Sequence, residues 1–169
     1  MRVLLFLLLL PTLIFMSCSG ESKVLVFTTP EITLQADGPL LEGSNTAQGD
    51  FKSTLADFLK TNGTSLDKVS EATLSAATLM LPDSMNSSLI SEITLQLAAD
   101  QVDMQKLGVL NPVPEGQTKL TLNIAKEQEK IGKILQQANM TFVADVNIKK
   151  DTANSLPIKG IFEFKITIK

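Results

Sequence analysis

Apolar and polar residues alternate in four segments of this chain, and this alternation constrains its fold more than any other feature of the sequence. In Ser91–Ala99, every second residue from Ile93 to Leu97 is apolar and the residues between them are polar. The other three segments are Gln117–Ala125, Met140–Lys150 and Ile158–Ile168. Because successive side chains of a strand point to opposite faces of a sheet, each segment is predicted to be an antiparallel strand with one buried face.

Three further segments are predicted to be strands, although their patterns are less regular. Lys23–Thr28 and Glu31–Ala36 are short, whereas Val69–Leu81 is long and rich in small residues. The apolar phase of Val69–Leu81 shifts near Ala76 and Ala77, which indicates a bent or bulged strand.

Two segments follow the helical period instead. Phe51–Thr61 places apolar residues at helical spacing, Asp50 can cap its first turn and Gly63 can end it. Lys126–Ala138 has one apolar stripe, and its opposite face of lysines and glutamates is typical of a solvated surface. The stretch Asp100–Gly116 is expected to be the longest irregular connection, and such loops often carry function.

About seven strands and two amphipathic helices predict a mainly β fold, an antiparallel β-sandwich whose helices cross between the sheets or close its ends. An α+β fold with both helices on one sheet face is the alternative. Residues 23–169 are long enough to form a single domain with its own core, and the sequence contains no internal repeat.

Residues 1–17 have the three parts of a secretory signal peptide. Arg2 supplies the positive start, Val3–Met16 is almost wholly apolar, and small residues follow at Ser17–Gly20. A transmembrane anchor is the alternative. However, a spanning helix needs about 20 apolar residues, and this run is shorter and contains Pro11.

The sequence FMSC at residues 15–18 resembles the lipobox of bacterial lipoproteins, in which a small residue precedes a cysteine that becomes the lipid-modified N-terminus. Phe15 departs from the aliphatic residue that is usual at its position. The resemblance implies cleavage before Cys18, lipidation of its sulfur and a membrane anchor, with residues 18–22 as the tether. Ser19 is not the aspartate that retains lipoproteins at the inner membrane, so the outer membrane is expected, with the domain facing either the periplasm or the outside.

An ordinary signal peptide with an incidental cysteine is the alternative to the lipobox. Cys18 is the single cysteine of the chain. An exported protein that kept one unmodified, unpaired thiol would be prone to oxidation, which favours lipidation of Cys18.

The composition excludes several kinds of site. The chain contains no His, no Trp and no Tyr. Catalytic triads with a histidine base and zinc sites built from His and Cys are therefore excluded, and no cofactor or metal ion is expected. A nucleic-acid partner is not expected either, because 18 acidic residues outnumber 15 basic ones and no basic stripe is present.

Carboxylates supply the remaining candidates for catalysis or metal binding. Asp100 with Asp103, and Asp67 with Glu71, could contribute to a two-carboxylate hydrolase site. A calcium site would need more oxygen ligands than the segment Asp100–Asp103 provides. Surface carboxylates that favour solvation of the domain are the simpler interpretation.

Two short motifs resemble the Asp-Ser/Thr-apolar pattern of O-glycosylation sites in some exported bacterial proteins. They are Asp83-Ser84-Met85 and Asp151-Thr152-Ala153, which makes Ser84 and Thr152 candidate glycosylation sites. Two turns that begin at an aspartate are the alternative interpretation.

Taken together, these features predict a non-catalytic, membrane-anchored lipoprotein of the bacterial cell envelope that acts as a binding or assembly module for another envelope protein. The alternative is a carrier or sensor of an apolar, lipid-like ligand, held in a cavity among aliphatic and phenylalanine side chains. The same side chains are also those of an ordinary filled core, which is the usual state of a protein interior.

Overall fold

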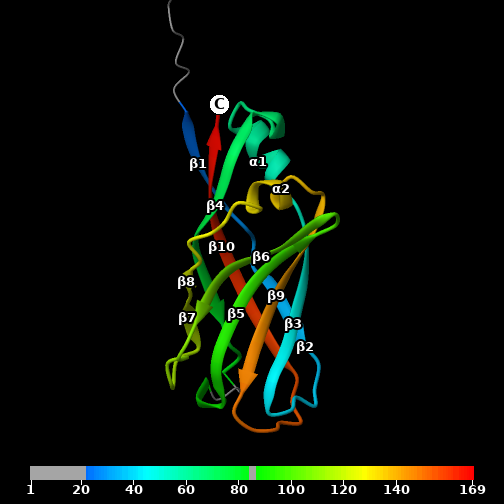
Figure 1. Ribbon diagram of the computed structural model, residues 1–169, viewed down its shortest axis with the longest axis vertical. Coiled ribbons are helices and arrows are strands. Elements are labelled where there is room, and N and C mark those ends of the chain that lie inside the picture. The colour runs from blue at the N-terminus through cyan, green and yellow to red at the C-terminus, as the bar shows by residue number, and fades with distance from the viewer. Residues whose placement is uncertain (1–21, 84–86) are drawn as a thin grey trace, which may run out of the picture.

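The computed structural model describes residues 22–83 and 87–169, which form ten β-strands and two short α-helices (Figure 1). The first five strands are β1 (Lys23–Thr28), β2 (Ile32–Ala36), β3 (Gly43–Lys52), β4 (Val69–Met80) and β5 (Ile90–Ala99). The other five are β6 (Val102–Leu110), β7 (Lys119–Thr121), β8 (Asn123–Ile124), β9 (Asn139–Ile148) and β10 (Leu156–Ile168). The helices are α1 (Leu55–Thr61) and α2 (Ile131–Leu135), with 3-10 turns η1 (Leu66–Lys68) and η2 (Ser87–Leu89).

All ten strands belong to one antiparallel sheet in the order β7-β4-β10-β2-β3-β9-β5-β6-β8, and β1 pairs with β10 beside β2. One short stretch of chain nearly joins the two ends of this sheet, because β7 pairs with β4 and β8 pairs with β6. Leu122 lies between β7 and β8, and its amide donates to the carbonyl of Ala77. Ala125 follows β8, and its amide donates to the carbonyl of Leu107. The sheet is therefore nearly closed into a barrel shape (Figure 1).

The prediction of a mainly β, antiparallel fold with two helices is confirmed. The strands number ten instead of about seven, and the two layers expected of a sandwich are opposite walls of one coiled sheet. The alternating segments bury the faces that their pattern indicates, and in β5 Ile93, Leu95 and Leu97 are fully buried. The corresponding residues of β9 and β10 are Phe142, Ala144, Val146, Ile148, Phe162, Phe164, Ile166 and Ile168.

Phenylalanine rings pack through the interior from one wall to the other. Phe142 of β9 stacks on Phe162 of β10 with ring centroids 4.2 Å apart, although these two strands are not neighbours in the sheet. Nearer the end of the sheet where β1 begins, Phe27 packs against both Phe58 and Phe164. Each stack adds a favourable ring contact of about 0.5–1.5 kcal/mol to the burial of its apolar surface.

Three of the bulges in the strand pairing have a serine at the extra position. Ser70 and Ser75 are the extra residues of β4 against β10, and Ser91 is the extra residue of β5 against β9. Each hydroxyl donates a hydrogen bond of 3.1 Å to a backbone carbonyl of the neighbouring strand. Because a bulge disrupts the regular ladder of backbone hydrogen bonds, each serine supplies a donor where the ladder is irregular. The bulge at Ser75 confirms the irregularity predicted near Ala76.

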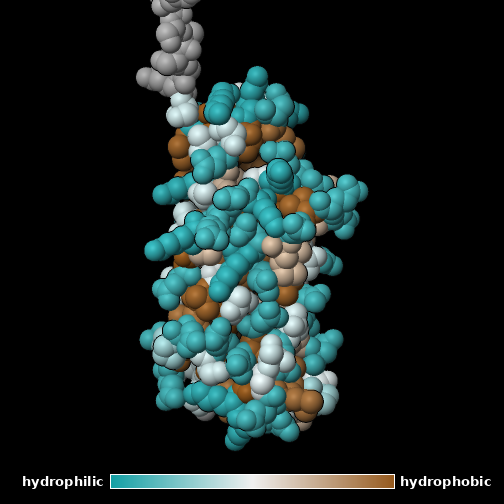
Figure 2. Space-filling view, in the orientation of Figure 1, coloured by the Kyte–Doolittle hydropathy of each residue, from teal (hydrophilic) through white to brown (hydrophobic). Residues whose placement is uncertain are grey.

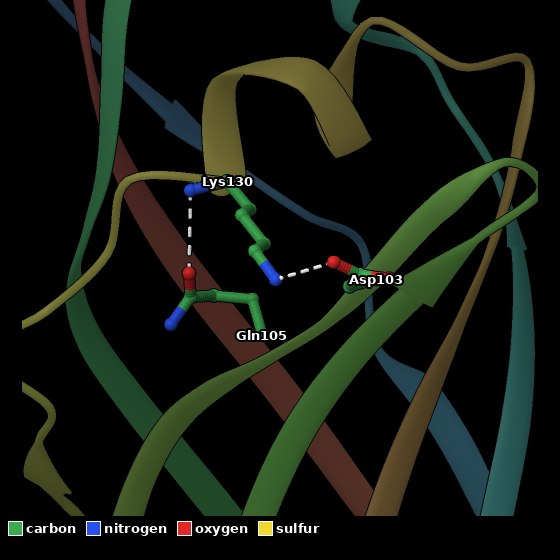
Figure 3. A network of polar contacts seen from close by, with 3 residues as sticks. All are labelled: Asp103, Gln105 and Lys130. Atoms are coloured by element: carbon green, nitrogen blue, oxygen red, sulfur yellow. Dashed lines mark hydrogen bonds and ion pairs between the residues drawn. The ribbon is translucent and has the colours of Figure 1, made fainter.

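Glutamine side chains continue the closure of the sheet beyond β7 and β8, where the chain turns toward α2. On the β4 side, the Gln128 amide oxygen accepts from the Leu74 N–H at 2.5 Å, and its Nε2 donates to the Leu74 carbonyl at 3.3 Å. On the β6 side, Gln105 Nε2 donates to the Glu127 carbonyl at 2.8 Å, and its Oε1 accepts from the Lys130 N–H at 3.2 Å (Figure 3). We call the line along which β4 and β6 approach each other the seam. Where β7 and β8 do not fill it, these side-chain amides form the hydrogen bonds that backbone groups of a strand would otherwise form.

The prediction of a helix from Phe51 was wrong in its first turn. Residues 51 and 52 belong to β3, and α1 begins only at Leu55. Asp50 therefore lies in a strand and does not cap the helix; its carboxylate accepts a hydrogen bond from the Thr141 hydroxyl at 2.7 Å. The strand was missed because the buried residues before Phe51 are Ala47 and Gly49, which are too small to give an apolar alternation.

The expected loop Asp100–Gly116 and the length of the second helix were also wrong. Residues 102–110 form β6, which pairs with β5. The extra residue of β6 in this pairing, Leu107, is buried, and it shifts the alternation out of phase. Of the predicted helix Lys126–Ala138, only Ile131–Leu135 is helical, because Gln128 ties the preceding turn to β4.

Candidate functional site

The chain enters the domain at one end of the elongated molecule (Figure 1). The first residue of β1, Lys23, follows Cys18 by five positions in the sequence. The connection from β3 to β4 and the last residue of β10 lie at the same end of the sheet. We call this end, formed by Lys23, residues 53–68 and Lys169, the tether end.

Three lysines that are far apart in the sequence lie next to one another at the tether end. Lys23 pairs with Ile168 on one side of β10, and Ile168 pairs with Val69 of β4 on the other side. The amide of Lys169 donates to the carbonyl of Lys68 at 3.0 Å, which places both residues just beyond this pairing. Sequence reasoning missed this cluster, because only the strand order brings its members together.

Charge differs in sign between the two ends of the molecule. The tether end carries four lysine and two aspartate side chains, namely Lys23, Lys60, Lys68, Lys169, Asp57 and Asp67. The opposite end, which we call the far end, consists of the loops 37–42, 81–83, 87–89, 111–118 and 149–155. These described residues carry five acidic and two basic side chains, namely Asp37, Glu42, Asp83, Glu115, Asp151, Lys149 and Lys150. The domain is therefore basic at the end where β1 begins and acidic at its far end.

Strand β1 has exposed valines and one edge that no other described strand pairs with. Val24 and Val26 are 57% and 53% exposed, whereas Leu25 and Phe27 point inward and are buried. In the described part of the chain, β1 pairs only with β10. Such an edge can accept a further strand, and exposed valines beside it offer apolar surface for a contact.

Asp103, one of the carboxylates that the sequence indicated, is held in a polar contact with α2. Lys130 Nζ lies 2.8 Å from Asp103 Oδ2, and the backbone N–H of the same lysine bonds to Gln105 (Figure 3). The hydrogen bond from Lys130 and its positive charge lower the pKa of Asp103 below the ordinary aspartate value. Asp103 is therefore ionised at neutral pH and cannot serve there as a general acid.

The other three indicated carboxylates are all exposed. Asp67 accepts a hydrogen bond from the Ser65 hydroxyl, which lowers the pKa of its carboxyl group. Asp100 lies in the turn between β5 and β6, and Glu71 lies on the outer side of β4. Among the described residues, no group of three or more acidic residues, histidines or cysteines is arranged to bind a metal ion.

Surface depressions accompany two of these groups, Asp100 and Glu71, and Figure 2 shows mainly hydrophilic side chains on the face of the molecule that it presents. One of about 600 Å³ lies where β3 and β5 end and β9 begins, and its lining includes Asp50, Asp100 and Thr141. Another, of about 400 Å³, lies between β4 and the turn that contains Gln128. In the first depression Thr141 already donates its hydroxyl to Asp50, so this pair stabilises the neighbouring strands β3 and β9.

The predicted modification sites differ in what the structure describes. Cys18 and Ser84 lie outside the described residues. Thr152 is half-buried at the far end, and its hydroxyl accepts from the backbone N–H two residues later at 3.3 Å. The preceding carboxylate, Asp151, accepts from the N–H of Glu42 at 2.7 Å. The turn therefore begins at Thr152, whose hydroxyl accepts from the backbone two residues on, whereas Asp151 joins the loop to Glu42.

No protein-family model matches the chain, and no curated protein is similar to it. Within residues 22–83 and 87–169, no helix combines the length and apolar character needed to cross a membrane. The chemistry and placement of the chain's own residues are therefore the basis for assigning a function.

Proposed function

We propose that this protein is a non-catalytic lipoprotein of the bacterial cell envelope, anchored at the outer membrane through lipid on Cys18, and that its domain is a binding or assembly module for another envelope protein. The observation that carries the proposal is the position of β1, which begins five residues after Cys18 at one end of the molecule. At about 3.6 Å per residue, the tether spans at most about 18 Å. Lipid on Cys18 would therefore keep the domain at the membrane surface.

The polar groups of the domain support binding rather than catalysis. The chain has no histidine, and Asp67 and Asp103 have lowered pKa values, so neither is suited to proton transfer near neutral pH. By contrast, the unpaired edge of β1 and the acidic loops of the far end are surfaces that a protein partner could contact.

The packing of the interior favours a binding module over a carrier of an apolar ligand. A carrier needs an enclosed space of a few hundred cubic ångströms for its ligand, on the order of 300–1,000 Å³. Here the centre between the walls is occupied by the stacked rings of Phe142 and Phe162. A ligand would have to displace these rings, and with them the contact between β9 and β10.

The anchor is tested by expressing the full chain and its Cys18→Ala variant in a bacterium that processes lipoproteins, with Ser19→Ala as the matched control. Wild type and Ser19→Ala are expected to incorporate a labelled fatty acid and to sediment with membranes. Cys18→Ala is expected to lose both properties, because only the sulfur of Cys18 can accept the lipid. Membrane retention of Cys18→Ala without label would contradict the proposal. The Ser19→Asp variant is expected to move from the outer to the inner membrane fraction.

A further inference from the structure

The lysines of the tether end lie within reach of the headgroups of the membrane to which Cys18 is attached. Five residue steps separate Lys23 from Cys18, which limits their separation to about 18 Å. Lys68 and Lys169 extend the same row, because their backbones are hydrogen-bonded beside the β1–β10–β4 pairing. A tether of this length lets the domain lie directly against the bilayer, where charges interact over a Debye length of about 8 Å at physiological ionic strength.

The balance of charge at this end is positive, and the aspartates do not cancel it. Asp67 lies 3.9 Å from Lys68 and accepts from Ser65, and Asp57 is the one other aspartate of the tether end. Glu21, two positions before Lys23 in the sequence, adds a third negative charge, so one of the four lysine charges remains in excess. At an anionic surface each lysine gains a roughly fivefold preference for the bound state.

The far end has the opposite sign and favours the same orientation. Its described loops carry five acidic side chains against two lysines. An anionic surface attracts the tether end and repels the far end, so tilting the domain over onto its loops is disfavoured.

We infer that the tether end is a membrane-contact surface, in which Lys23, Lys68 and Lys169 bind anionic phospholipid headgroups and hold the domain upright with its acidic far end directed away from the bilayer. This inference rests on the proposed lipid anchor and adds an orientation to it. The lipid on Cys18 fixes the distance from the membrane, and the lysine cluster fixes which face of the domain meets it.

The test uses the full-length protein after its processing in the cell, purified in detergent and reconstituted into vesicles. One set of vesicles contains phosphatidylcholine only, and the other contains phosphatidylcholine mixed with phosphatidylglycerol. Acetylation of individual lysines by an N-hydroxysuccinimide ester is followed by mass spectrometry. In the anionic vesicles Lys23, Lys68 and Lys169 are expected to react at least about threefold more slowly than in the neutral ones, whereas Lys149 and Lys150 of the far end are expected to react equally in both. High salt is expected to remove the difference.

A pair of charge-reversed variants provides the matched control. Lys23→Glu/Lys68→Glu is expected to lose the protection of Lys169 in anionic vesicles, and Lys149→Glu/Lys150→Glu is expected to keep it. All four positions are exposed, so circular dichroism of both variants is expected to match wild type. Flotation of the protein with both kinds of vesicle, but equal reactivity of the tether-end lysines in them, would refute the contact surface and leave the anchor intact. Failure to float with either kind, with no lipid on the peptide that contains Cys18, would refute the anchor and this inference together.

Discussion

Replacing Gln128 by methionine tests whether side-chain amides hold the seam between β4 and β6. The side-chain length is kept, but three hydrogen bonds are lost: one from the Leu74 N–H, one to the Leu74 carbonyl and one to the Ala125 carbonyl at 2.7 Å. Each such bond contributes about 0.5–1.5 kcal/mol to the free energy of unfolding. Because Gln128 is only half-buried and water can reach the freed groups in part, we expect a loss near the lower end of the sum, about 2 kcal/mol.

For a domain of this size the expected loss corresponds to a fall in Tm of about 4–8 °C. Unfolding by heat and by urea is best followed by far-ultraviolet circular dichroism, because the chain has no Trp or Tyr to report by fluorescence. The control is Gln117→Met, since Gln117 is exposed in the loop before β7. Faster amide hydrogen exchange at Leu74 in the Gln128 variant would locate the effect at the seam. A change in stability no larger than that of the control would refute a role for this amide in closing the sheet.

Other substitutions test the bulges, the packed interior and the surface charges. Ser75→Ala removes the hydroxyl donor at a bulge and is expected to lower the free energy of unfolding in urea by about 1 kcal/mol; an unchanged urea midpoint would mean that water replaces the serine. Gly160→Ala places a methyl group against the ring of Phe162, which is expected to cost about 1–3 kcal/mol in the same assay; a variant as stable as wild type would show that the stacked rings can shift freely. In an NMR titration, the Asp103 carboxyl is expected to titrate below the ordinary aspartate pKa, and Lys130→Met is expected to return it toward that value. Because the contact lowers the pKa of Asp103 in the folded state, it stabilises the folded protein above the ordinary aspartate pKa. This stabilisation is lost as the pH falls through the folded-state pKa. Equal titration midpoints of Asp103 in wild type and in Lys130→Met would contradict the contact.

Most of the strands could be predicted because their buried residues are large and alternate strictly. Ile93 to Leu97 in β5 and the second half of β10 are such cases, and their buried faces were identified correctly. In β3 the buried residues are partly Ala47 and Gly49, so packing against β2 and β9 defines that strand more than its own pattern does. In β6 the bulge at Leu107 breaks the alternation that a strand would otherwise show.

The closure of the sheet and the tether end could not be read from the sequence. Gln105 and Gln128 are ordinary polar residues in the sequence, and their role follows only from the backbone groups that they face. Likewise Lys23 and Lys169 become neighbours only because β1 and β10 pair at their ends. The sequence FMSC is, by contrast, a local pattern, so its resemblance to a lipobox could be noted from the sequence alone.

The position of β10 has a consequence for how the protein comes to be folded. This last strand pairs with β1, β2 and β4, so the first half of the chain cannot complete its sheet before residues 156–168 have been synthesised. Contacts between residues so distant in the sequence form slowly, because a long loop must close first. Until then the chain stays open, because β1, β2 and β4 lack the strand that joins them.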